Sequence, residues 1–174
     1  MAKPRIMVVG GDAFSSVAIE RAGFGRWCHM ANILADGTVL DARDDEVCGI
    51  APGVRLRPAG YLDTEPRWAL FEAPTDAHYA AWEAAGRAQL GKPYDQRGIL
   101  DFAEATFTGD YVDANYAGAD SKAWFCDCVA SWMAITAGDI PQPPKELLLF
   151  TLTPSSALLL FIGAAWTQIA SKGI

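Results

Sequence analysis

The sequence predicts a single α+β domain in which helices pack against an antiparallel β-sheet. Short apolar runs bounded by glycine or proline indicate strands, and two of them flank Asp36-Gly37 as in a β-hairpin. Other stretches carry apolar residues at helical spacing. The 174 residues suit one hydrophobic core, so we expect one domain over residues 1–174.

Four segments are predicted to form strands. "RIMVVGG" at 5–11 is a short apolar run closed by two glycines, which is typical of a buried strand. "HMANILADGTVLDAR" at 29–43 is predicted to be a hairpin, and "GVRLRPAGYL" at 53–62 and "RWALFEA" at 67–73 further strands.

Helical spacing appears in four segments. "SSVAIERAGF" at 15–24, "DAHYAAWEAAGRAQL" at 76–90 and "QRGILDFAEATF" at 96–107 are predicted helices, and a fourth begins near Cys126 and ends at Gly138. We expect Thr75 to cap the helix at 76–90 and Gly91 to stop it. The polar stretch 108–122 is predicted to be a surface loop.

Charge and hydropathy narrow the class of partner. The net charge is −7 and there is no basic run, which argues against nucleic acid or an anionic membrane surface. The N-terminus does not resemble a signal peptide, so we expect a cytoplasmic protein or one delivered by another route. Residues 147–171 carry no charge, but polar residues at 151–156 leave only "ALLLFIGAAW" uninterrupted. We expect a buried helix or strand pair there, and no membrane contact.

Cys126 and Cys128 stand two residues apart at the head of an apolar helix. They could be a metal pair, a redox pair, or one nucleophile with a bystander. On a helix they point about 200° apart, which disfavours one shared metal, and redox pairs usually have the spacing Cys-x-x-Cys. Four cysteines are too few for a disulfide scaffold, so reduced thiols and no metal are expected.

Cys126 has the position of a nucleophile. Free N–H groups and the helix dipole favour thiolate in the first turn. The base must be His29 or His78. His78 lies off the apolar stripe of its helix and is expected to face solvent, whereas His29 starts the first strand of the hairpin.

Asp41, on the returning strand, is the candidate to orient His29. A two-residue loop at Asp36-Gly37 would place the two side chains on opposite faces. A three-residue loop with Gly37 left-handed would place Asp41 diagonal to His29 on one face, within reach. The catalytic interpretation therefore predicts the three-residue loop. The alternative, equally supported by these residues, is a solvated aspartate beside Arg43.

Several short motifs occur in a characteristic order: "WCHMANILADGTVLDAR", then "GKPYD", then "WFCDCVASWM". This order resembles the circularly permuted branch of the NlpC-type papain-like hydrolases, which includes YiiX- and YaeF-like proteins and phage-encoded relatives. The resemblance covers about residues 5–160, and a late "LTPSSAL" fits it. Family members usually carry Ser-Glu after the cysteine, where this chain has Asp127-Cys128.

The resemblance implies a permuted papain-like fold and a thiol hydrolase without cofactor. Cys126 would be the nucleophile, His29 the base and Asp41 the orienting residue, although the family more often has His, Glu or Gln at the third position. Tyr94 is a candidate for lining the substrate site, with a packed core tyrosine as the favoured alternative. The implied substrate is an amide or peptide bond, expected in cell-wall peptidoglycan.

Two other functions remain open. A lipid or ester acyl hydrolase or acyltransferase would use the apolar segment 157–166 to hold an acyl chain. A non-catalytic binding protein, for example a virion component, would keep the fold without turnover, and the unusual Asp127-Cys128 pair favours this alternative.

Overall fold

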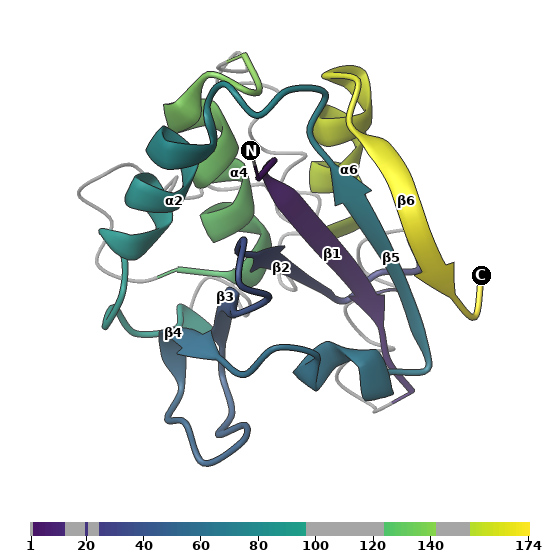
Figure 1. Cartoon of the computed structure of the whole chain (residues 1–174). Coiled ribbons are helices and arrows are strands. Elements are labelled where there is room, and N and C mark those ends of the chain that lie inside the picture. The colour runs from purple at the N-terminus through teal and green to yellow at the C-terminus, as the bar shows by residue number, and fades with distance from the viewer. Residues whose placement is uncertain (1, 13–19, 21–24, 97–123, 142–153) are drawn as a thin grey trace, which may run out of the picture.

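Six strands form one antiparallel sheet in the order β4-β3-β2-β1-β5-β6 (Figure 1). The computed structural model describes residues 2–12, 20, 25–96, 124–141 and 154–174. The strands are β1 (Arg5–Gly10), β2 (His29–Ile33), β3 (Val39–Arg43), β4 (Gly53–Arg57), β5 (Arg67–Glu72) and β6 (Thr167–Lys172). With the helices described below, this arrangement confirms the predicted α+β class.

The central strands are buried on both faces of the sheet. Successive side chains of a strand point to opposite faces. One face packs against the helices and contributes Ile6, Val8, Met30, Leu40, Ala42, Val54 and Phe71. The other face carries Met7, Val9, Ala31, Ile33 and Val39, and a short 3₁₀ helix, η1 (Tyr61–Thr64), covers it with Leu62.

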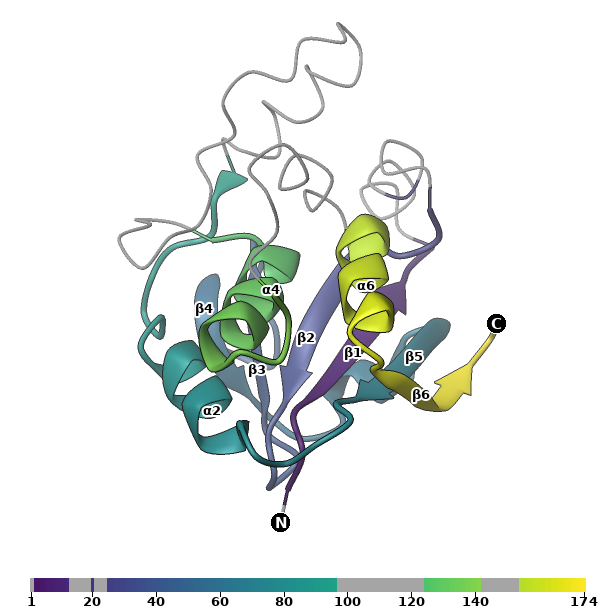
Figure 2. The same cartoon turned by 90° about the horizontal axis from the view of Figure 1, so that it is seen from above.

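Three helices pack on the first face: α2 (Tyr79–Arg87), α4 (Cys126–Ala137) and α6 (Pro154–Gly163). Helix α4 lies between the other two and rests on β2 and β3 (Figure 2). Gly86 lets α2 approach α4 closely, since a Cβ there would lie 2.5 Å from Sδ of Met133. As predicted, α4 ends at Gly138, which has a left-handed φ of 84°.

The β2–β3 hairpin has the three-residue loop that the catalytic interpretation predicts. Asn32 pairs with Leu40 and Ile33 with Val39, so the loop consists of residues 35–37. Gly37 is left-handed, with φ of 85°, which glycine adopts without steric penalty. This register brings Asp41 to the same face as His29.

Some predicted boundaries differ from the structure. Helix α2 begins at Tyr79 rather than at residue 76, because the Thr75 hydroxyl accepts a hydrogen bond from the Ala77 N–H (3.1 Å) in a turn before the helix. Gly91 is left-handed beyond the helix end, as expected. The predictions for 15–24, 96–107 and 108–122 fall outside the described residues, apart from Glu20 and Gln96.

The charge-free C-terminal segment is buried only in part. Helix α6 buries Ala157, Leu158 and Phe161, whereas Leu159 and Ile162 on its outer side are exposed. The predicted segment 157–166 thus lies mostly in a helix with one buried side. Strand β6, which follows it at one edge of the sheet, is exposed at every residue. In the part of the chain that the structure describes, no helix is long and apolar enough to cross a membrane.

Candidate active site

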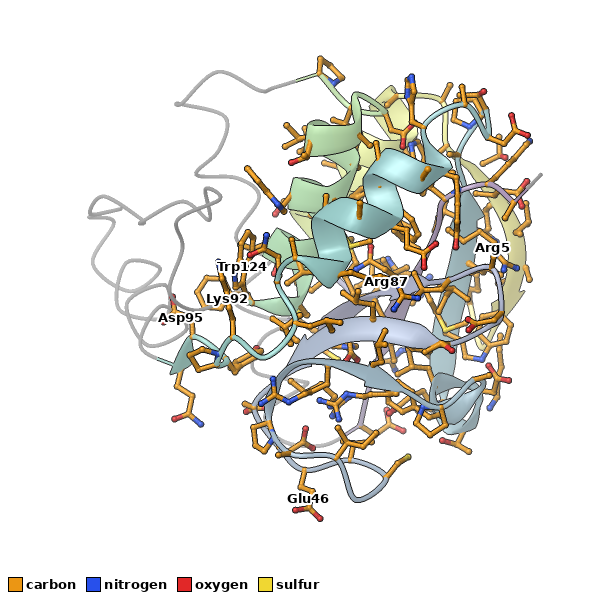
Figure 3. The ribbon with its side chains drawn as sticks, turned by 60° about the vertical axis from the view of Figure 1, so that its left-hand side comes forward. Arg5, Glu46, Arg87, Lys92, Asp95 and Trp124 are labelled. Atoms are coloured by element: carbon orange, nitrogen blue, oxygen red, sulfur yellow. The ribbon has the colours of Figure 1, made fainter. Side chains whose placement is uncertain are left out.

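Cys126 is the first residue of α4. Phe125 precedes it with extended backbone angles, so the helix begins abruptly at the cysteine. Trp124 fixes the incoming chain through two hydrogen bonds, one from its N–H to the Pro93 carbonyl and one from the Asp95 N–H to its own carbonyl (both 3.1 Å). Lys92 adds a cation–π contact, 5.4 Å from the centre of the Trp124 indole (Figure 3). The sulfur is thus held at a defined place on the sheet.

The Cys126 thiol lies against the start of β2 and is almost fully buried, with 4% of the residue exposed. Its nearest electrostatic neighbours include the backbone N–H groups of Met30 and Asp127. Burial raises the pKa of the Cys126 thiol well above its usual value, and the Asp127 carboxyl raises it further. The two N–H groups lower it by less. The N–H group at the helix start favours thiolate, as expected, but burial of the thiol outweighs this effect.

His29 and Asp41 form a buried pair on neighbouring strands. Nε2 of His29 lies 3.0 Å from Oδ2 of Asp41. An ionised carboxylate only accepts, so Nε2 carries the hydrogen and Nδ1 is left as the basic nitrogen. Asp41 is fully buried, which excludes the alternative of a solvated strand-end aspartate.

Two further side chains surround Asp41. Nε of Arg57 donates to Oδ1 at 2.7 Å, and the Tyr61 hydroxyl donates to Oδ2. Burial alone raises the pKa of Asp41, but hydrogen bonds and charge from His29, Tyr61 and Arg57 outweigh it and bring the pKa below its ordinary value. Asp41 is therefore an anion in the folded protein.

The described contacts include no hydrogen bond between Cys126 and the His29 ring. The Cys126 sulfur sits beside the backbone of Met30, on the face of the sheet that α4 covers. The His29 side chain alternates with Met30 along β2 and points to the other face, where it is bonded to Asp41. The structure thus brings His29 and Asp41 together but does not bring the His29 ring to the thiol.

Asp127 is a buried carboxyl directly after the nucleophile, with 2% of the residue exposed. The Cys126 thiol contacts its Oδ1 at 3.8 Å, and Oδ2 has no hydrogen-bond partner among the residues that the structure describes. Burial raises the pKa of Asp127 to about 7. The carboxyl therefore exchanges its proton near neutral pH, next to the sulfur.

The remaining predicted residues take less direct positions. Cys128 belongs to the hydrophobic core under the helices, which fits a bystander. His78 is partly exposed and pairs with Asp139 through Nδ1 and Oδ1, 3.0 Å apart. The Tyr94 ring packs edge-on against Phe125, 6.3 Å between centres, at the margin of the same core.

Sequence reasoning missed Arg57, Tyr61 and the burial of Asp127. Arg57 alternates with apolar residues in "GVRLR", a pattern that indicates a solvent-exposed arginine. Tyr61 follows Gly60 in a turn segment and gives no sign of contact with a distant strand. One feature of the sequence indicates that Asp127 is buried: it is an acidic residue within an otherwise apolar helix start.

Comparison with known proteins supports the fold. No family model matches the chain, and no curated protein matches its sequence. The crystal structure of the metalloprotein YiiX from Escherichia coli superposes with a TM-score of 0.65 over 98% of this chain and 97% of YiiX. The chain has a YiiX-like fold. Sequence identity over this YiiX-like fold is 13%, so the likeness concerns the fold alone.

YiiX is described as a metalloprotein, which raises the question of a metal in this YiiX-like chain. Protein zinc sites need three or four His, Cys or carboxylate ligands around one point. Among residues 2–12, 20, 25–96, 124–141 and 154–174, no three such side chains are grouped to hold an ion. The described residues therefore do not fit a metal centre.

Proposed function

We propose that the protein is a thiol hydrolase that cleaves an amide or peptide bond through a Cys126 acyl-enzyme. The observation that carries the proposal is the juxtaposition at the start of β2. A buried cysteine at a helix N-terminus lies against the same peptide unit whose histidine is bonded to a buried carboxylate. In the proposed function Cys126 would be the nucleophile, His29 the base and Asp41 the orienting group that thiol hydrolysis requires.

The reaction follows from these positions. Nδ1 of His29 takes the proton of Cys126, and the sulfur attacks the carbonyl carbon. Free N–H groups at the start of α4 would receive the oxyanion. Collapse breaks the C–N bond, and the imidazolium protonates the leaving amine. Water, deprotonated by His29, then attacks the thioester and releases the carboxylic acid and the thiol.

Burial of the thiol makes the base indispensable. A solvent-exposed cysteine would supply some thiolate by itself near pH 8, but the pKa of Cys126 is raised by burial. Thiolate therefore forms only together with imidazolium on His29. Asp41 stabilises that imidazolium from the far side of the ring.

We further propose a cell-wall peptide as substrate, within a permuted NlpC-type hydrolase family. The motif order around His29, Tyr94 and Cys126 supports the family assignment, and the YiiX-like fold agrees with it. Such a substrate lies outside the cytoplasm, so the protein would reach it with a phage particle or by another route. Tyr94, beside Phe125 at the helix start, would line the approach.

Digestion of purified peptidoglycan peptides tests this function. Mass spectrometry of the products should show one new amine and one new carboxylate per cleavage. Cys126→Ser and His29→Ala should each abolish the products, while Cys128→Ser should retain them. Failure of the wild-type protein to cleave any cell-wall peptide would exclude this substrate class.

A binding protein that keeps the fold without turnover is the second candidate. The observations in its favour are the neutral resting thiol and the absence of a Cys126–His29 hydrogen bond in the described contacts. In that case, loss of His29 would leave the reactivity of Cys126 unchanged.

A further inference from the structure

Arg57 is a buried arginine whose contacts are directed at the candidate site. Only 1% of the residue is exposed. Nε donates to Oδ1 of Asp41 at 2.7 Å, and Nη1 reaches the carbonyls of Val47 (3.5 Å) and Ile50 (3.3 Å). A buried guanidinium is unfavourable unless it is paired, so this arrangement depends on the Asp41 carboxylate.

The two oxygens of Asp41 have separate partners. Oδ1 is taken by Arg57, and Oδ2 by His29 and the Tyr61 hydroxyl. Rotation of the carboxylate would break the bonds to all three. The charge-assisted bond on Oδ1 therefore fixes Oδ2 on the imidazole.

We infer that Arg57 is a positioning residue for the nucleophile–base pair: its bond to Oδ1 holds the Asp41 carboxylate aimed at His29, and through these two residues it determines the reactivity of Cys126. This inference rests on the proposed function. The groups that face Asp41 are His29 from β2, Arg57 from β4 and Tyr61 from η1. Arg55 lies opposite Asp41 in the β3–β4 register but donates to the Val54 carbonyl, and Arg43 of the same strand is bonded to Asp45.

Removal of the Arg57 charge has a defined consequence. In Arg57→Met, Oδ1 of Asp41 would lose its charge-assisted bond, and the carboxylate could turn away from His29. The imidazolium on His29 would then lose a counter-charge held in place. Arg57→Met should therefore behave like Asp41→Asn, although Arg57 has no described contact with His29 or Cys126.

The test measures alkylation of Cys126 by iodoacetamide at pH 7, with the exposed Cys48 of the same molecule as internal reference. We expect Arg57→Met and Asp41→Asn each to slow Cys126 by about tenfold or more, the effect of one unit of pKa. Arg55→Met is the matched control. It lies two residues away on β4 and its Nη1 donates to the Val54 carbonyl (2.9 Å), so it should leave the rate unchanged.

A double variant separates positioning from folding. If Arg57 acts through Asp41 alone, Arg57→Met combined with Asp41→Asn should react no more slowly than Asp41→Asn by itself. The double variant also removes the unpaired buried charge, so it serves as the test should Arg57→Met fail to fold. If the double variant is alkylated at Cys126 more than threefold more slowly than Asp41→Asn, the inference is overturned. A folded Arg57→Met with the wild-type alkylation rate would overturn it too.

His29→Ala distinguishes this failure from failure of the proposed function. If His29→Ala leaves Cys126 alkylation unchanged, the nucleophile–base pair does not exist and both proposals fall. If His29→Ala slows Cys126 but Arg57→Met does not, only the role of Arg57 is refuted.

Discussion

Oδ2 of Asp41 lies 3.0 Å from Nε2 of His29, although the two residues are twelve positions apart in the chain. The pair exists because the β2–β3 loop has three residues, which sets Asp41 diagonal to His29 on one face of the sheet. Every step of the proposed chemistry depends on this register.

The loop glycine should be a stability determinant. Gly37 has φ of 85°, and a Cβ there would also lie 3.2 Å from that of Ala59. We expect Gly37→Ala to lower the free energy of unfolding by about 1–2 kcal/mol, measured by urea denaturation. Gly163→Ala is the matched control, since its Cβ meets nothing within 4 Å, and it should be neutral or slightly stabilising. Equal effects of the two substitutions would contradict the assigned loop conformation.

Asp127 should make stability fall as pH rises. Its pKa is raised from 3.8 to about 7, so the folded protein holds a proton that the unfolded chain releases at lower pH. The stabilisation is complete below pH ~4 and is lost as pH rises to ~7. Relative to wild type, Asp127→Asn should therefore gain stability between pH 4.5 and pH 8, by up to about 4 kcal/mol.

Urea unfolding at pH 4.5 and pH 8 measures the difference in stability between Asp127→Asn and wild type. For Asp41→Asn the pH dependence of this difference should have the opposite sign. The pKa of Asp41 is lowered, so the stability that its carboxylate adds is present above its unfolded pKa and is lost as pH falls through the folded pKa. A pH-independent difference between Asp127→Asn and wild type would mean that Asp127 is solvated.

Cys128 should be dispensable for chemistry. It lies in the hydrophobic core and has no role in the proposed reaction. Cys128→Ala should reduce the free energy of unfolding by roughly 1 kcal/mol, through lost packing, and leave cleavage of the substrate intact. Cys126→Ala should abolish cleavage at little cost in stability. Abolition of cleavage by Cys128→Ala in a folded protein would point instead to a dithiol mechanism.

The hairpin and the Cys126 helix could be predicted because local signals determine them. Asp36-Gly37 between alternating strands indicates the turn, and Gly138 marks the helix end. These two elements place His29 beside Asp41 and Cys126 at the start of a helix, as predicted.

The surroundings of these residues could not be predicted in the same way. Arg57 is buried because a carboxylate from another strand pairs with it, and this depends on the three-dimensional register of β3 and β4. The pKa of Cys126 is raised because its thiol is buried, whereas the sequence indicated only the helix dipole, which favours thiolate. The prediction that a helix begins at residue 76 is wrong because Thr75 forms a local turn that competes with the helix.

The most direct test of the account is the pH dependence of Cys126 alkylation in wild type and in His29→Ala, with Cys128 as reference. The account predicts that wild-type Cys126 is alkylated at neutral pH, although burial raises the pKa of its thiol, because His29 takes the proton, and that His29→Ala slows this reaction. Cys128 should react only at high pH in both proteins. If Cys126 and Cys128 titrate alike, or Cys126 is indifferent to His29, the nucleophile–base pair does not exist and the binding function takes its place.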